Sequence, residues 1–161
     1  MIAFIGFLNL VLVGLLAGSI FGIWLGYNPA EFSYPTYVEY QQNAIRSLNT
    51  IMPILGLITI ILTVVSAAAQ RNQQSVFYTL IIAAVLLISG GLITRFGNQP
   101  INAVVMRWSD SDVPGNWSEL RDKWWQFHIG RTVVTVIAFC LITWVSIRKD
   151  SSNEKNVKNY G

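Results

Sequence analysis

Four long apolar segments dominate the chain, and each of them is long enough to cross a lipid bilayer. They cover approximately residues 2–26, 50–69, 76–96 and 129–147. A membrane-spanning helix needs about 20 predominantly apolar residues. We therefore predict an all-α fold, a polytopic membrane four-helix bundle formed by residues 1–149. Residues 150–161 are polar and lack helical periodicity, and we expect them to form a disordered cytoplasmic tail.

Polar residues at helical spacing lead into the second and fourth apolar segments. One set consists of Glu39, Gln42, Arg46 and Asn49, and the other of Trp117, Arg121, Trp124, His128 and Arg131. Steps of three and four residues place the members of each set on one face of a helix. Helices 2 and 4 of the bundle are therefore expected to extend beyond the bilayer.

A short capping helix is predicted between the third and fourth spans. Arg95, Asn98 and Asn102 follow the third apolar segment, and Pro100 is suited to the first turn of a helix over residues 101–108. In a four-span arrangement this helix lies at the same bilayer boundary as the two polar faces. Three sets of polar residues are thus expected to converge there.

Two interpretations of this boundary are open. Ionisable residues near membrane spans usually face the protein interior and often mark a functional site. Alternatively, Arg46, Arg95 and Arg131 extend to lipid phosphates while tryptophans form an interfacial belt. For the whole set we favour a pocket, because a belt does not require residues on one face of a helix.

The content and position of charged residues indicate where the protein is located and which partners it is expected to have. Only 12% of the residues are charged and 53% are hydrophobic, whereas soluble domains carry about 25% charged residues. Anionic membrane lipid accounts for the basic pI near 9.2, so we expect no nucleic-acid partner. Arg148 and Lys149 directly follow the last span, as is typical of a cytoplasmic anchor. We therefore expect both termini in the cytoplasm and a location in the plasma (inner) membrane.

Reactive side chains are sparse. Cys140 is the only cysteine and His128 the only histidine, so an intrachain disulfide is excluded and a metal site of the usual kind is not expected.

The first span carries a glycine at every fourth position from Gly14 to Gly26. Small residues at this spacing let another helix approach closely in lipid, which favours tight packing inside the bundle. A homodimer through Gly14, Gly18 and Gly22 is the second alternative. Asn9, an isolated amide in this span, is expected to hydrogen bond across the bundle.

The boundary residues also resemble a family signature. The matching residues are Asn98-Gln99-Pro100-Ile101-Asn102, Trp108, Trp117, Arg121, Trp124, His128 and Arg131, with Gln42, Arg46, Asn49 and Met52-Pro53 upstream. They resemble the anthrone oxygenase-like integral membrane family, long described as a domain of unknown function. Its pattern is N-x-P-x-N, a tryptophan-bearing loop and R-x-x-W-x-x-x-[NH]-x-x-R, and the likeness covers residues 1–149.

This resemblance implies an oxidoreductase. The members that give the family its name oxidise anthrones to anthraquinones with molecular oxygen, and no metal or organic cofactor is generally assigned to them. The implied function is a cofactor-independent oxygenase acting on a planar phenolic, anthrone-like or quinone-like molecule. The alternative is a non-enzymatic membrane protein that binds lipid, quinone or a partner helix through the same residues.

The residues suggest a role for each group in the oxygenase hypothesis. His128 is the candidate base, because imidazole titrates near neutral pH. Arg131 and Arg46, together with Arg121, are expected to stabilise developing oxyanions. Trp117 and Trp124 are expected to stack on an aromatic ring. The remaining candidate substrate-binding residues are Gln42, Asn49, Arg95, Asn98 and Asn102.

Overall fold

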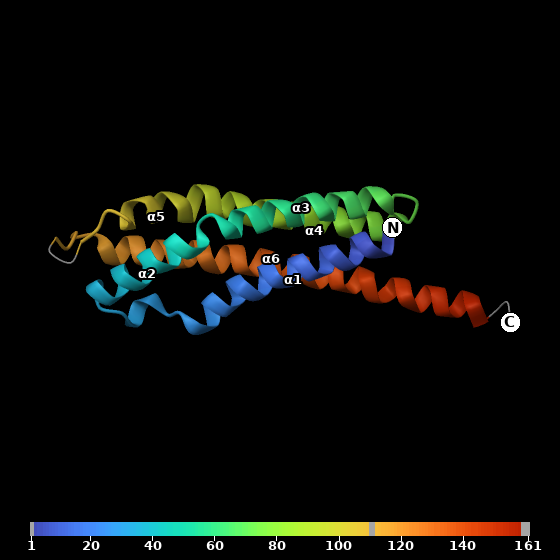
Figure 1. Ribbon diagram of the computed structural model, residues 1–161, viewed down its shortest axis with the longest axis horizontal. Helices are drawn as coiled ribbons and strands as arrows, with labels where there is room; N and C mark the ends of the chain where they lie inside the picture. The colour runs from blue at the N-terminus through green and yellow to red at the C-terminus, as the bar shows by residue number, and fades with distance from the viewer. Residues whose placement is uncertain (1, 110–111, 159–161) are drawn as a thin grey trace.

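The chain folds almost entirely into helices, and the computed structural model describes residues 2–109 and 112–158 (Figure 1). In chain order the elements are α1 (Ile2–Gly26), η1 (Pro29–Glu31), α2 (Tyr34–Leu48), α3 (Ile51–Ala69), α4 (Gln74–Ile93), η2 (Thr94–Asn98), α5 (Gln99–Val105) and α6 (Trp117–Lys158). No strand occurs among these residues, and α1, α3, α4 and α6 contain the four predicted spans. The predicted all-α membrane fold is therefore confirmed.

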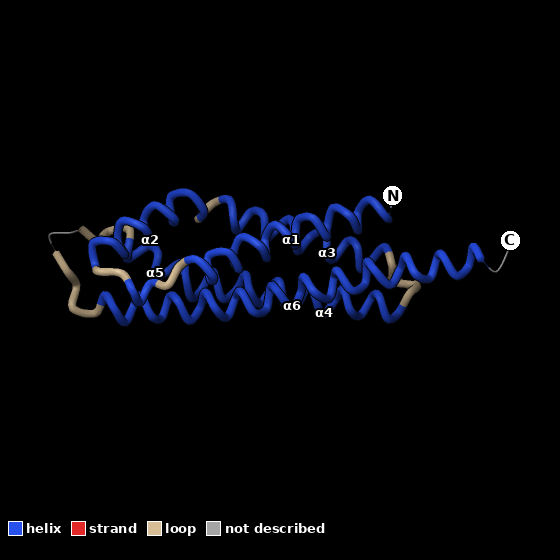
Figure 2. Tube along the Cα trace, turned by 90° about the horizontal axis from the view of Figure 1, so that it is seen from below, coloured by secondary structure: helices blue, strands red, loops and turns tan. Residues whose placement is uncertain are grey.

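The four long helices lie side by side in an elongated bundle, with α2 and α5 together at one end (Figures 1 and 2). Helix α6 packs against α4 and α1, and α3 packs against the same two helices. Small residues allow close packing, since a Cβ atom on Gly90 would lie 3.2 Å from Oγ1 of Thr135. We call the end that holds α2 and α5 the cap end.

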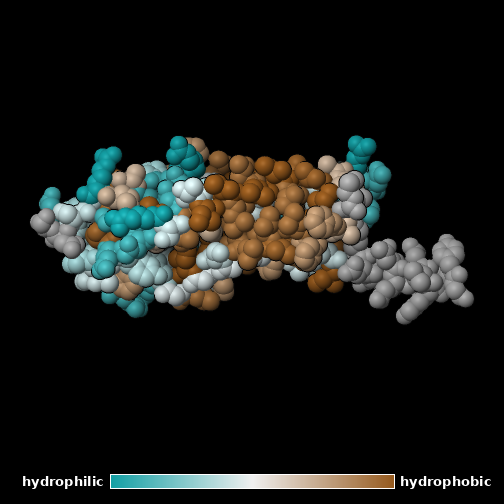
Figure 3. Space-filling view, viewed as in Figure 1, coloured by the Kyte–Doolittle hydropathy of each residue, from teal (hydrophilic) through white to brown (hydrophobic). Residues whose placement is uncertain are grey.

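An apolar belt crosses the middle of the bundle on the face seen in Figure 3, with hydrophilic residues towards both ends. Four helices are long and apolar enough to cross a membrane, and only 22–28% of each apolar stretch is buried inside the protein. Large side chains such as Phe7, Leu57 and Trp144 point outward, at 63%, 58% and 53% exposure. A surface of this kind is suited to lipid, and the chain is an integral membrane protein.

The second span and its extension are two helices rather than the continuous helix expected from the sequence. Helix α2 ends at Leu48, and α3 begins at Ile51 after the turn residues Asn49 and Thr50. Pro53 has no backbone N–H and its ring crowds the carbonyl four residues earlier, that of Asn49. It therefore stands in the first turn of α3, where a missing donor costs little.

Helix α4 continues into the cap without a break at Gly97-Asn98. Residues Thr94–Asn98 form a π-helical segment that leads directly into α5. A Cβ atom on Gly97 would lie 2.6 Å from Cγ of Phe127, so only glycine permits this approach of the segment to α6. Close packing against α6 thus accounts for the glycine without a turn.

Helix α6 extends from the cap end to Lys158 and so continues beyond the predicted domain boundary at residue 149. No proline or glycine interrupts the sequence between Gly130 and Gly161. Residues 159–161 lie outside the described residues, and the division into a membrane domain and a tail stays a prediction. The start of α1 and the last turns of α6 lie at the end opposite the cap (Figure 1).

The first span combines one confirmed expectation and one correction. Thr63 Oγ1 donates a hydrogen bond of 2.9 Å to Asn9 Oδ1, so Asn9 does bond across the bundle. Tight glycine packing inside the bundle is wrong for Gly18, Gly22 and Gly26, because added Cβ atoms there would meet nothing within 4 Å. These glycines face outward, and a homodimer through Gly14, Gly18 and Gly22 stays a prediction.

Candidate functional site

A cavity of about 400 Å³ opens inside the bundle near its cap end. Its wall is built from the second half of α1, from α2, from the first turns of α3, from the end of α4 with α5, and from α6. The polar and aromatic lining residues are Tyr27, Tyr40, Gln41, Asn49, Thr94, Arg95, Gln99, Asn102, Trp124, Arg131 and Thr135. The site therefore brings together residues from both polar sets that lead into the second and fourth spans, which we call the polar stripes, and from the segment between the third and fourth spans.

Arg131 is the central charged group of this cavity. Its Nη2 lies 2.8 Å and its Nε 3.2 Å from Nδ1 of His128, and its Nη1 donates to Thr94 Oγ1 at 3.4 Å. Among the side chains that the structure describes, no carboxylate lies within 4 Å of this guanidinium. A positive charge held only by neutral partners favours a ligand that brings an anion or an electron-rich oxygen.

His128 lies behind Arg131 and does not line the cavity. The side chain is fully buried, and its Nε2 lies 3.1 Å from the backbone oxygen of Ile20. A neutral ring with its hydrogen on Nε2 satisfies both contacts, because Nε2 then donates to Ile20 and Nδ1 accepts from Arg131. In this arrangement neither ring nitrogen has a lone pair free for a ligand proton.

Trp124 connects the charged group to the cap. Its ring lies parallel to that of His128, with centroids 5.3 Å apart and an interplanar angle of 7°, and the Arg131 guanidinium lies 5.9 Å from the Trp124 ring centroid. Trp124 Nε1 donates to Asn102 Oδ1 at 2.8 Å. Asn102 Nδ2 in turn donates to Asn49 Oδ1 at 3.3 Å. Three elements, α6, α5 and the end of α2, are thus joined along one wall of the cavity.

The cavity wall next to Trp124 also contains residues that the sequence analysis did not select, and the Tyr27 ring lies edge-on to Trp124 with centroids 5.9 Å apart. Tyr27 OH donates to Gln41 Oε1 at 2.9 Å, and the Tyr27 and Tyr40 rings are stacked with centroids 4.9 Å apart. The stripe chosen in α2 is its more exposed face, because Glu39, Arg46 and Asn49 are exposed while Gln41 is buried. A helical pattern running Tyr34, Tyr37, Gln41 and Ile45 marks the buried face and was the available signal.

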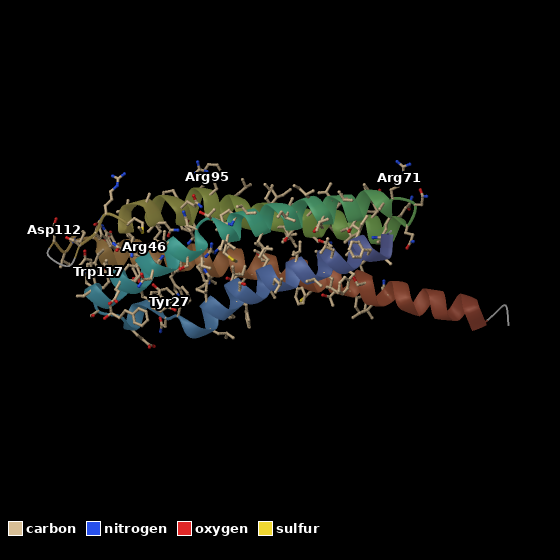
Figure 4. The ribbon with its side chains drawn as sticks, viewed as in Figure 1. Tyr27, Arg46, Arg71, Arg95, Asp112 and Trp117 are labelled. Atoms are coloured by element: carbon tan, nitrogen blue, oxygen red, sulfur yellow. The ribbon has the colours of Figure 1, made fainter. Side chains whose placement is uncertain are left out.

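Six of the predicted site residues do not line the cavity: Gln42, Arg46, Asn98, Trp117, Arg121 and His128. Gln42 Nε2 donates to the backbone oxygens of Val105 and Trp108, both at 3.0 Å, and so ties α2 to the end of α5. Arg46 is exposed on α2 near the cap end, where Figure 4 labels it, and contacts Gln42 and Asn43 at 3.4 Å.

Trp117 and Arg121 form a separate group near the tip of the cap. The Arg121 guanidinium lies 4.9 Å from the Trp117 ring centroid, and its Nε donates to Asp122 Oδ1 at 2.8 Å. Trp117 packs edge-on against Tyr34 with centroids 5.4 Å apart. Figure 4 shows Trp117 at the cap end and Arg71 at the opposite end of the bundle. The stripe on α6 therefore divides into two groups, of which only the second reaches the cavity.

Asn98 supports the cavity wall from behind. The side chain is 1% exposed, and its Nδ2 donates to the backbone oxygen of Trp124 at 2.9 Å. Its Oδ1 has no hydrogen-bond partner among the described residues. The π-helical segment and Gly97 together bring this amide against α6. Five predicted residues, Asn49, Arg95, Asn102, Trp124 and Arg131, do line the cavity.

Protein groups able to hold a metal ion are not gathered at this site. Among the residues that the structure describes, no three histidine, cysteine, aspartate or glutamate side chains lie close enough together. The cavity instead offers a guanidinium, amides, phenols and an indole against an apolar wall. These groups are suited to orienting a flat organic molecule with oxygen substituents.

Comparison with known proteins identifies the family of the chain. The family described as Anthrone oxygenase matches residues 42–141, a region that runs from the second half of α2 through α3, α4 and α5 into α6 and does not include α1. No curated protein and no solved structure matches the chain. The family match covers more than half of the sequence. The chain therefore belongs to the anthrone oxygenase family.

Proposed function

We propose that the protein is a membrane oxygenase that converts a planar phenolic ketone of the anthrone type into the corresponding quinone with molecular oxygen. The observation that carries this proposal is the guanidinium of Arg131, which lines the cavity, has no carboxylate partner among the described side chains and is held by the neutral ring of His128. An anthrone that loses a proton carries its charge on the ketone oxygen. That oxygen is the group expected to meet Arg131.

The proposed reaction balances with the substrate and oxygen alone. The first methylene proton leaves to water and produces an electron-rich anion, which passes an electron to oxygen before the two radicals join through a C–O bond. Loss of the second C–H proton breaks the O–O bond and forms the new carbonyl. One oxygen atom ends in the quinone and the other leaves as water, so the carbon loses four electrons and oxygen gains four.

Each cavity group has a role in this proposal. Arg131 stabilises the substrate oxyanion, and Asn102 and Asn49 donate or accept hydrogen bonds at neighbouring oxygens. Trp124, whose ring stands at the wall, orients the flat substrate. We assign His128 the role of a positioning residue for Arg131, because its Nδ1 is used by the guanidinium. The role of base expected from the sequence would require that contact to break.

The direct test is oxygen consumption and quinone absorbance with purified protein in lipid nanodiscs and dihydroxyanthrone as substrate. We expect one oxygen consumed per quinone formed, above the rate of protein-free autoxidation. Removal of one oxyanion partner typically lowers kcat by about 10²–10³, and we expect R131M to show a loss of this size. R71M is the matched control, since Arg71 is exposed at the opposite end of the bundle. Equal rates for R131M and R71M would contradict the proposal.

The same proposal includes an orientation in the membrane. We place both termini in the cytoplasm of a plasma (inner) membrane, because Arg148 and Lys149 directly follow the last apolar stretch. The cap and the polar part of the cavity then face outward. The orientation is tested by replacing Cys140, introducing a single cysteine at exposed Val113 and labelling it in intact cells with a membrane-impermeant thiol reagent. Labelling that occurs only after permeabilisation would indicate the reverse orientation.

A further inference from the structure

The cavity is elongated along the bundle axis. Its lining runs over nine residues of α3, from Met52 to Ile60, and over twelve residues of α6, from Trp124 to Thr135, which are eight and eleven residue-to-residue steps. At 1.5 Å per residue these stretches correspond to about 12 Å and about 16 Å. The cavity therefore extends from the cap well into the apolar belt.

Polarity changes from one end of this cavity to the other. The helices run in alternate directions, and the lining residues farthest from the cap are Leu16 on α1, Ile60 on α3, Leu87 on α4 and Thr135 on α6, which mark what we call the belt end. Towards the cap, the same helices and α5 contribute the indole, amides and guanidinium described above. Among the lining residues that the structure describes, the belt end is formed by aliphatic side chains and Thr135. The Thr135 hydroxyl donates its hydrogen bond to the backbone oxygen of Arg131 in the same helix.

The wall of the cavity also reaches the surface that faces lipid. Pro53, Leu57 and Gly91 line the cavity and are exposed, and Leu57 belongs to the apolar belt with 58% of its surface exposed. A molecule dissolved in the bilayer can thus meet the site without crossing the polar cap.

From this polarity and length we infer that the ligand is an amphiphile, a phenolic or quinol-type ring that carries a hydrocarbon chain. The ring contacts Trp124 and Arg131 from the cavity side, and its hydrocarbon chain extends along Leu16, Ile60 and Leu87 to the belt end. The inference rests on the proposed function and names its substrate class as a lipid-soluble, chain-bearing phenol. A ring without a chain would leave the aliphatic walls of the belt end without contacts.

The hydrocarbon chain determines the orientation of the bound ligand more than its affinity. Hydrocarbon that moves from lipid to an aliphatic cavity gains little, since lipid tails are as apolar as leucine. The free energy that favours the bound state comes from the charged and hydrogen-bonded ring end. The experiment must therefore locate the chain rather than measure affinity against chain length.

Photo-crosslinking in phosphatidylcholine nanodiscs tests the placement. One probe is dihydroxyanthrone with a decyl chain and a terminal diazirine, a second has the diazirine directly on the ring, and a third is the diazirine alkane without a ring. We expect the long probe to label peptides that contain Leu16, Ile60 or Leu87, and excess dihydroxyanthrone to abolish this labelling. The ring-free alkane should label only lipid-facing positions.

Two tryptophan variants of α3 serve as a matched pair. Ile60 lines the cavity, whereas neighbouring Ile61 is 52% exposed in the belt. I60W fills the belt end, and a clash at this position should reduce labelling there by about tenfold while I61W leaves it unchanged. Equal labelling in both variants would overturn the inference.

The remaining outcomes separate this inference from the proposed function. If the ring probe labels the Trp124 wall and is displaced by dihydroxyanthrone while the chain labels only lipid-facing positions, the chain inference fails and the function stands. If dihydroxyanthrone displaces neither the ring probe nor the long probe, the chain inference and the proposed function both fail. Loss of labelling in phosphatidylglycerol nanodiscs would identify a lipid headgroup as the occupant of the Arg131 end and would also overturn the inference.

Discussion

Replacement of Gly97 by alanine tests how closely the segment that carries the site must approach α6. The added Cβ atom would lie 2.6 Å from Cγ of Phe127 and 2.7 and 2.8 Å from the two Cδ atoms. Carbon atoms prefer separations of about 3.5–4.0 Å, so the groups must separate by about 1 Å. Because Cγ is the base of the ring, ring rotation alone does not relieve the contact. Overpacking of this kind costs about 1–3 kcal/mol.

The consequence should reach the cavity. Asn98 follows Gly97 directly and donates to the Trp124 backbone at 2.9 Å, and Asn102 accepts from the Trp124 indole at 2.8 Å. A displaced π-helical segment lengthens both contacts. We therefore expect G97A to lower both the free energy of unfolding and the turnover of dihydroxyanthrone.

Reversible unfolding in mixed micelles, followed by circular dichroism, measures the stability change. G18A is the control, because a Cβ atom at Gly18 meets nothing within 4 Å and alanine favours the helix by up to about 1 kcal/mol. A double-mutant cycle with F127A isolates the clash, since the cost of G97A should disappear when the ring is absent. The reasoning is refuted if G97A costs the same in both backgrounds or stabilises the protein as G18A does.

Two further predictions concern single side chains. H128N should keep turnover within about tenfold of wild type with an unchanged pH–rate profile, because the asparagine oxygen can still accept a hydrogen bond from Arg131. Loss of activity together with an altered pH–rate profile would instead identify His128 as the base. Burial raises the pKa of Tyr37, so above pH 10 the unfolded chain releases a proton that the folded chain keeps. Stability should therefore fall as pH rises above 10, and Y37F should remove that part of the fall in unfolding measurements; an identical pH dependence in Y37F would contradict the assignment.

Periodicity predicted which residues of a helix share a face but not which face meets the rest of the protein. In α2 the polar stripe that includes Glu39 and Arg46 is exposed, and the neighbouring face with Tyr37 and Gln41 is buried. Both faces satisfy helical spacing. The aromatic and aliphatic residues Tyr34, Tyr37 and Ile45 mark the buried face, whereas the turn at Asn49 and Thr50 decides which other helices that face meets.

The arrangement around Arg131 was also beyond the sequence. The spacing of His128 and Arg131 places them one turn apart, which is compatible with a base beside a cation or with a positioning contact. Helix α1 favours the positioning contact, because the backbone oxygen of Ile20, more than 100 residues away in the chain, hydrogen bonds to the second ring nitrogen of His128. Tyr27 likewise enters the cavity only because α1 ends beside α2.

The four spans, the polar borders, the capping segment and the family signature were predictable from the sequence, because each depends on residue type and local spacing. A run of about 20 apolar residues must be helical in a bilayer, where backbone groups have no other partners. The tertiary structure alone decided which polar residues line a common cavity and how far that cavity reaches into the belt. Both depend on the angles between helices and on close approaches such as that of Gly97 to Phe127, which are set by packing between residues distant in the chain.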